Sequence, residues 1–248
     1  MRYETKKVTI PAGDGTRMKL LILVPTQDYD KKDRTGVLWI HGGGYVTGMA
    51  GMVYMSRAKA LVKNYGAVVV SPEYRLAGQA SYPAALMDCH YALLYLREHT
   101  EELGVRSDQI MVGGESAGGG LAAALCMYEK DCGGVEIAFQ MPLYPMLDNE
   151  DTETSRNNHA PVWNTKRNHY GWAKYLRGLP GGRSHATPLP PGGRTMPGCL
   201  PPTPLCAPPS PSMPRPSPMW NICGRPAWRR RRTSTRGCST LSTCCSRF

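Results

Sequence analysis

The sequence predicts an α/β fold in which a mostly parallel central sheet is covered by helices on both faces. Short apolar runs that are typical of strands alternate with longer segments whose apolar residues recur at helical spacing. Residues 37–40 and 67–70 are continuously apolar, as expected for strands buried on both faces. Helices that connect such strands must then lie on the faces of the sheet.

The expected elements follow one another with short connections. The first two strands flank a Gly- and Asp-containing turn, and Pro83 can open a helix at its first turn. The expected strands cover residues 8–10, 18–24, 37–40, 67–70, 109–112 and 135–141. The expected helices cover residues 52–64, 83–99 and a segment that includes 121–125.

Residues 148–180 interrupt this alternation. The segment is polar and contains Trp163, Tyr170, Trp172 and Tyr175. It is interpreted either as a cap or lid over an apolar acyl pocket or as an ordinary surface excursion with a helix at about 165–177.

The pentapeptide Gly-Glu-Ser-Ala-Gly at residues 114–118 points to a reaction mechanism. A serine between glycines, after a strand and before a helix, is a nucleophile elbow that presents the hydroxyl of Ser116 at a sharp turn. The glycines allow that turn because they carry no side chain. A serine hydroxyl becomes a good nucleophile only when a base removes its proton.

A second motif, His-Gly-Gly-Gly-Tyr at residues 41–45, follows directly on an expected strand. Ester hydrolysis passes through a tetrahedral intermediate with a negative oxygen, and backbone N–H donors aimed at it contribute about 3–4 kcal/mol each. Consecutive glycines let a loop present such donors. His41 is interpreted as a structural residue that orients this loop, and not as the base.

Four motifs in this order resemble those of the hormone-sensitive-lipase-like esterases of the α/β-hydrolase fold. They lie at residues 41–44 (His-Gly-Gly-Gly), 73–77 (Glu-Tyr-Arg-Leu-Ala), 82–85 (Tyr-Pro-Ala-Ala) and 114–119 (Gly-Glu-Ser-Ala-Gly-Gly). The resemblance covers roughly residues 5–182. It implies a lipase-like serine carboxylesterase with small-molecule ester substrates, no cofactor and no metal.

The resemblance also implies roles for individual residues. Ser116 is expected to be the nucleophile, and the N–H groups of Gly43, Gly44 and Ala117 are expected to form the oxyanion hole. Asp88 and Asp108 are interpreted as structural.

The acid and the histidine of a catalytic triad are not identified in this chain. In this fold they follow the nucleophile in the order acid, then histidine. The histidines after Ser116 are His159, His169 and His185, none in a matching context, and no carboxylate follows Glu153. We therefore expect a carboxylic ester hydrolase that is inactive with this sequence, because the acid and the histidine of the triad are absent. The alternative is a non-catalytic binding protein on the same scaffold.

The chain divides into a hydrolase domain at residues 1–182 and a tail at 183–248, which is expected to be disordered. The tail carries ten arginines and no lysine, aspartate or glutamate, so it accounts for ten of the eleven net positive charges. The arginine run at 229–232 could bind phosphates, and the prolines could form polyproline ligands. We expect no nucleic-acid partner, and the oligomeric state stays open.

No secretory signal and no membrane-spanning stretch are expected, because the N-terminus is charged and no apolar run is long enough. Cys89, Cys126 and Cys132 show neither disulfide-scaffold nor zinc-ligand spacing. A cytoplasmic location is therefore expected.

The composition of the tail indicates a shifted reading frame, so that the C-terminal part of the fold is missing. In the frame one base back, the codons of residues 219–221 (Met-Trp-Asn) force Val-Glu, and each Met-Pro junction forces alanine. The shifted frame also permits, without forcing them, an acid-bearing segment at 208–213 and a histidine-bearing segment at 232–246.

Sequencing of the gene tests this hypothesis. We predict a frameshift near residues 181–186, arising from mutation or sequencing error. A confirmed reading frame, together with stop codons in the shifted frame before the histidine-bearing segment, would contradict it.

Overall fold

A computed structural model describes residues 2–27 and 33–179 of the chain. The tail at 183–248 and His185 lie outside the described residues. The described strands form a six-stranded sheet with the order β1-β2-β4-β3-β5-β6. These strands are β1 (Tyr3–Pro11), β2 (Arg17–Pro25), β3 (Arg34–Ile40), β4 (Val68–Pro72), β5 (Val105–Glu115) and β6 (Phe139–Leu143). The helices are the short 3-10 helix η1 (Ala50–Met55), α1 (Arg57–Tyr65), α2 (Ala84–Glu98), α3 (Ala117–Cys132), α4 (Glu153–Arg156) and α5 (Thr165–Tyr175).

The sheet is mostly parallel, as predicted. β3 pairs in parallel with both β4 and β5, and β5 pairs in parallel with β6. The antiparallel part consists of the β1–β2 hairpin and the β2–β4 pair. Parallel carboxyl ends place the loops that follow β3, β4, β5 and β6 at one edge of the sheet.

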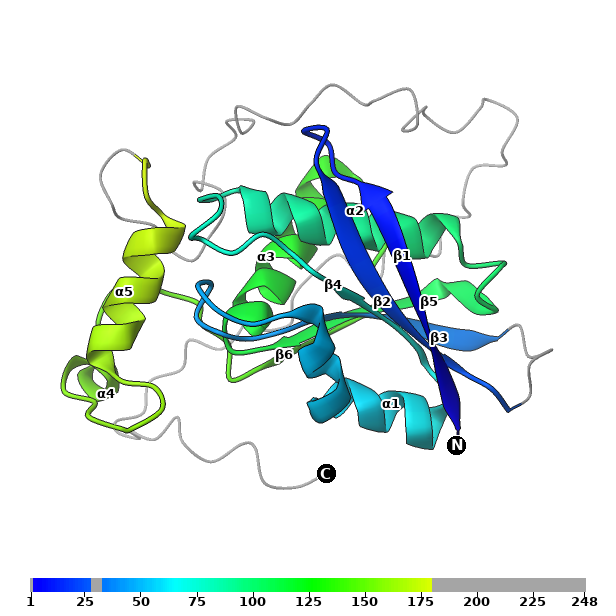
Figure 1. The fold of residues 1–248 in the computed structure, drawn as a ribbon, viewed down its shortest axis with the longest axis horizontal. Helices are drawn as coiled ribbons and strands as arrows, with labels where there is room; N and C mark the ends of the chain where they lie inside the picture. The colour runs from blue at the N-terminus through cyan, green and yellow to red at the C-terminus, as the bar shows by residue number, and fades with distance from the viewer. Residues whose placement is uncertain (1, 28–32, 180–248) are drawn as a thin grey trace, which may run out of the picture. The chain divides into compact units, whose positions relative to one another are not determined.

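Helices cover both faces of the sheet (Figure 1). The alternation of side chains along β3 shows this arrangement: Leu38 and Ile40 pack in the apolar cluster that includes α2 and α3, whereas Val37 and Trp39 pack with η1 and α1. All four side chains are almost completely buried. Each aliphatic side chain of this kind stabilises the fold by about 1.5–3 kcal/mol through its burial.

Two predicted elements differ from the structure. The helix predicted over 52–64 is divided at Ser56, whose hydroxyl accepts a hydrogen bond from the Ala58 amide and so begins a new helix. The strand predicted over 135–141 begins only at Phe139. The reason is that the Val135 amide donates to the Glu129 carboxylate at 2.8 Å, which holds this residue in a turn after α3.

The segment at 148–180 contains α4 and α5, and α5 agrees with the helix predicted there. Asn164 begins α5 because its side chain accepts a hydrogen bond from the Arg167 amide. Among the described residues, no helix combines the length and the apolar character needed to cross a membrane.

A buried ion pair connects the loop after β4 to α2. The Asp88 side chain is 1% exposed and accepts from the Arg75 guanidinium at 2.7 Å and 2.9 Å and from the Arg75 amide at 2.8 Å. Arg75 also pairs with Asp14 in the β1–β2 turn. These carboxylates raise the pKa of Arg75, the hydrogen bonds to Asp88 being the largest cause.

We predict that Arg75→Leu lowers the free energy of unfolding by about 3–5 kcal/mol, because it leaves the Asp88 carboxylate buried without its cation. Urea denaturation measures this loss. Arg106→Leu is the matched control, since the Arg106–Asp108 pair is exposed and its loss should cost at most about 1 kcal/mol. Equal losses in both variants would contradict the prediction.

Candidate active site

Ser116 occupies the sharp turn between β5 and α3. Its backbone has φ 55° and ψ −117°, a conformation that is strained for a residue with a side chain. The loop after β6 holds this turn, because the Ser116 amide donates to the Leu143 carbonyl and the Met146 amide donates to the Ser116 carbonyl, both at 3.0 Å. The strain is therefore maintained by bonds from a neighbouring element.

Glycines bring the end of β3 against this turn. A methyl group at Gly118 would overlap the carbonyl oxygens of Ile40 and His41. One at Gly42 would lie 2.9 Å from the Glu115 carbonyl oxygen and 3.3 Å from the Ser116 Cβ. The loop that follows β3 therefore passes directly beside Ser116.

The loop at residues 41–48 turns sharply beside the nucleophile elbow. Gly43, Gly44 and Tyr45 all have positive φ, and the amides of Val46 and Thr47 donate back to the Gly43 carbonyl. Within the described part of the chain, the amides of Gly43 and Gly44 donate no hydrogen bond. These two donors are therefore available to an acceptor from outside.

Ala117 is the first residue of α3. The first amides of a helix have no acceptor within the helix, and they carry its positive partial charge. The structure thus places unpaired donors on both sides of Ser116, from the loop after β3 and from the start of α3.

His41 is tied into the loop. Its Nδ1 lies 2.7 Å from the Gly42 carbonyl oxygen, so the neutral ring donates there, and the ring stacks on Tyr74 with centroids 4.2 Å apart. The side chain is buried, and this burial lowers the pKa of His41 below its usual 6.5. The imidazole is therefore held neutral. No hydrogen bond joins it to the Ser116 hydroxyl in the described part of the chain.

A carboxylate–imidazole pair that sequence reasoning did not find lies in the segment at 148–180. His169 Nε2 is 2.9 Å from Asp151 Oδ1, and its hydrogen bond lowers the pKa of Asp151. The pair follows Ser116 in the chain order acid, then histidine, but within the described residues no hydrogen bond joins it to Ser116. Its two members are 18 residues apart without a surrounding motif, so the sequence carried no signal for it.

The aromatic residues of the same segment differ in their surroundings, and Tyr170 is exposed. Trp172 and Tyr175 are buried against Tyr45, with the Tyr45 and Tyr175 rings stacked at 4.1 Å. They fill the core instead of lining a pocket. Trp163 is half-buried, and its ring lies against Gly44 of the same loop.

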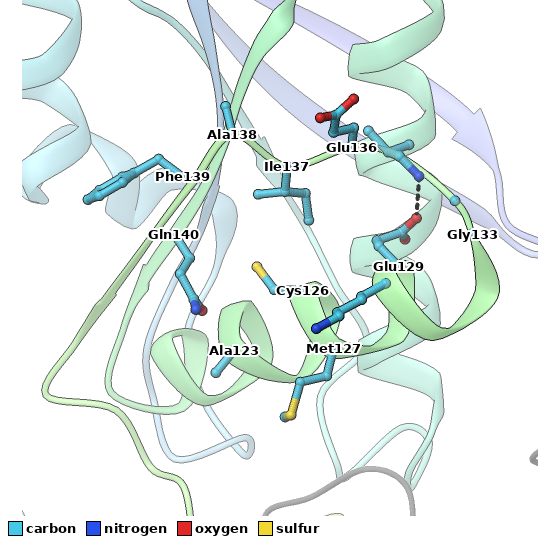
Figure 2. A pocket seen from close by; sticks show the side chains of 13 residues that line it. Ala123, Cys126, Met127, Glu129, Gly133, Glu136, Ile137, Ala138, Phe139 and Gln140 are labelled. Atoms are coloured by element: carbon cyan, nitrogen blue, oxygen red, sulfur yellow. Dashed lines mark hydrogen bonds between the residues drawn. The ribbon is translucent and has the colours of Figure 1, made fainter. Parts of the chain in front are cut away.

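A cavity of about 820 Å³ lies between the C-terminal half of α3 and the chain that leads into β6. Figure 2 shows Cys126 and Ile137 pointing into it from opposite sides. Burial and the nearby Glu129 carboxylate raise the pKa of Cys126 to about 11. None of the expected site residues lines this cavity, and no cluster of metal ligands occurs in the described ranges.

Comparison with known protein families gives a match over residues 37–207 to the alpha/beta hydrolase fold. Among curated proteins, the chain is similar to Esterase LipI of Mycobacterium tuberculosis, with 35% identity over 63% of this chain and 48% of that protein. It is 36% identical to Carboxylesterase NlhH of the same organism over 51% of this chain and 40% of that protein. The chain spans about half the length of the curated relatives it matches.

Solved structures show the same likeness. A bacterial heroin esterase superimposes with a TM-score of 0.65 and 34% identity, over 70% of this chain and 55% of that one. A thermostable esterase from Pseudomonas putida superimposes with a TM-score of 0.67 and 28% identity, over 75% of this chain and 58% of that one.

We predict that acid destabilises the fold through His41. Its folded-state pKa is below 6.5, so the unfolded chain binds the proton more readily. Above about pH 7, His41 does not lower the free energy of unfolding. As the pH falls below about 6.5, the free energy of unfolding decreases by up to about 1.4 kcal/mol per pH unit because of His41. Urea midpoints at pH 7.5 and 5.5 should differ less in His41→Gln than in the wild type. The exposed His159→Gln is the control and should keep the wild-type difference.

Proposed function

We propose, from the premise that this chain belongs to the alpha/beta hydrolase fold family, that its site is built for hydrolysis of carboxylic esters through an acyl-enzyme. The observation that carries the proposal is the strained turn at Ser116 between the unpaired amides of the glycine loop and of α3. Relatives named as esterases support the same reaction class. The substrate is a small carboxylic ester.

In this proposal Ser116 Oγ attacks the carbonyl carbon of the ester. The carbonyl oxygen becomes an oxyanion that accepts hydrogen bonds from the amides of Gly43, Gly44 and Ala117. Each donor stabilises the transition state by about 3–4 kcal/mol when it is aimed at the oxyanion. The intermediate expels the alcohol, and water then releases the acid and frees Ser116.

The proton of Ser116 needs an acceptor, and a histidine usually fills this role. Within the described residues the Ser116 hydroxyl makes no hydrogen bond, and His41 and His169 are each bonded elsewhere. This observation favours a second candidate function, a non-catalytic binding protein that keeps the same oxyanion-binding surface for a carbonyl or carboxylate ligand.

Three wider assignments belong to the same proposal. Residues 1–182 form the hydrolase domain, and 148–180 form its cap, because α5 packs against the glycine loop. The tail at 183–248 binds no nucleic acid. A reducing cytoplasm suits the chain, because Cys89 and Cys126 form no disulfide.

A fluorophosphonate probe distinguishes the two candidates, because it labels only a serine that a base activates. We predict weak labelling that disappears in Ser116→Ala, since loss of the base slows such reactions by up to about 10⁶-fold. The label should map to Ser116 by peptide mass spectrometry.

His169→Gln is the matched control for the imidazole and should leave the labelling rate unchanged, because within the described residues no hydrogen bond joins His169 to Ser116. Labelling that is equal in the wild type and Ser116→Ala would exclude the esterase proposal and favour the binding protein. If His169→Gln abolishes labelling, the Asp151–His169 pair supplies the base.

A further inference from the structure

Helix α5 makes a backbone-to-backbone contact with the loop that carries the proposed oxyanion donors. A methyl group built on Gly171 would lie 2.6 Å from the carbonyl oxygen of Gly44 and 3.5 Å from its carbonyl carbon. A real Cβ does not approach an oxygen this closely. Any residue other than glycine at position 171 must therefore push α5 and the loop apart.

The contact falls on the peptide that joins Gly44 to Tyr45. This peptide directly follows the one that carries the Gly44 amide, the proposed oxyanion donor. Both residues have positive φ, 61° at Gly44 and 64° at Tyr45. A displacement of the Gly44 carbonyl must be absorbed by these dihedral angles, and it therefore changes the direction of the Gly44 N–H.

Two aromatic side chains of α5 pack on Tyr45 and support the conformation of the loop at residues 41–48. A tyrosine at positive φ is strained and persists only where its surroundings hold it. Tyr45 is 3% exposed, and its ring stacks on Tyr175 of α5, with its centroid 5.1 Å from that of the Trp172 ring. Its hydroxyl donates to the Met146 carbonyl at 3.1 Å, and its own carbonyl accepts from the Ala77 amide at 2.8 Å.

Trp163, which precedes α5, packs against both Gly44 and Gly171. A methyl group on Gly44 would lie 2.6 Å from Cζ3 of the indole and would overlap the neighbouring Cη2. Gly44 is thus in close contact with both an indole ring and the backbone of α5. Both contacts come from the segment at 148–180.

From this arrangement we infer that α5 is a positioning element for the oxyanion loop, with Gly171 as its positioning residue. The inference rests on the proposed function for the role of the Gly43 and Gly44 amides. The atoms nearest to a methyl group on Gly171 belong to Gly44 and Trp163, so Gly171 acts through the loop. Displacement of α5 therefore changes the oxyanion donors without altering the nucleophile elbow.

Gly171→Ala tests the inference, because helix propensity and the inference predict opposite effects. Alanine is favoured over glycine inside a helix, so helix propensity alone predicts an unchanged or more stable protein with normal reactivity. The inference predicts altered amide resonances of Gly43, Gly44 and Tyr45 in ¹H–¹⁵N spectra. It also predicts fluorophosphonate labelling of Ser116 slowed by on the order of 10²-fold. Unchanged resonances and an unchanged labelling rate would overturn it.

Ala173→Gly is the matched control. Ala173 is an exposed residue of the same helix, so this variant weakens the helix without touching the loop. It should keep the loop resonances and the labelling rate of the wild type. Loop changes of equal size in Ala173→Gly and Gly171→Ala would also overturn the inference, since helix stability alone would then explain them.

The two readouts separate failure of the inference from failure of the proposed function. If the wild type does not label at all, the esterase proposal fails, and the loop resonances still test whether Gly171 sets the loop. If Gly171→Ala does not fold, Tyr175→Leu takes its place, because it removes the ring stacked on Tyr45. It should shift the Gly44 and Tyr45 resonances more than Ala173→Gly does, and equal shifts would overturn the inference.

Discussion

The close approach of two backbones, the end of β3 and the start of α3, is the constraint on which the rest of the site depends. Gly42 and Gly118 allow it, because a side chain at either position would meet backbone or Cβ atoms of the opposite segment. Parallel pairing of β3 with β5 brings both carboxyl ends to one edge of the sheet. The fold therefore creates the site by bringing two loops into contact at that edge.

The two edges of the described sheet differ in chemistry. The β1 edge carries Glu4, Lys6 and Lys7, and charges of this kind discourage pairing with another strand. Residues 137–147, which include β6, contain no charged side chain, and Phe139 there is 57% exposed. The match to the Pseudomonas putida esterase covers only 58% of that structure. The glycine loop and the nucleophile elbow both lie within residues 37–207, the part that matches the family.

The sequence predicted the sheet and the nucleophile elbow because both depend on local patterns. The apolar run at 37–40 predicts a buried strand, and the pentapeptide around Ser116 predicts a sharp turn between a strand and a helix. Three features depend on particular side-chain contacts that no sequence pattern indicated, and they were not predictable. They are the hydrogen bond from the Val135 amide to the Glu129 carboxylate ahead of β6, the Asp151–His169 pair, and the burial of Tyr175 on Tyr45. Gly171 stands in a polar helix with nothing in its neighbours to indicate that a carbonyl of the loop lies against it.

At Ser116, the positive φ that reduces stability and the hydroxyl proposed for catalysis belong to the same residue. Glycine adopts φ 55° without a steric penalty, and relief of such strain is worth roughly 1–3 kcal/mol. The most stabilising replacement at this turn would therefore remove the hydroxyl that gives the turn its chemical use. A search for thermostable variants of this chain, made without a selection for reactivity, would be drawn toward glycine at position 116 and would lose the nucleophile.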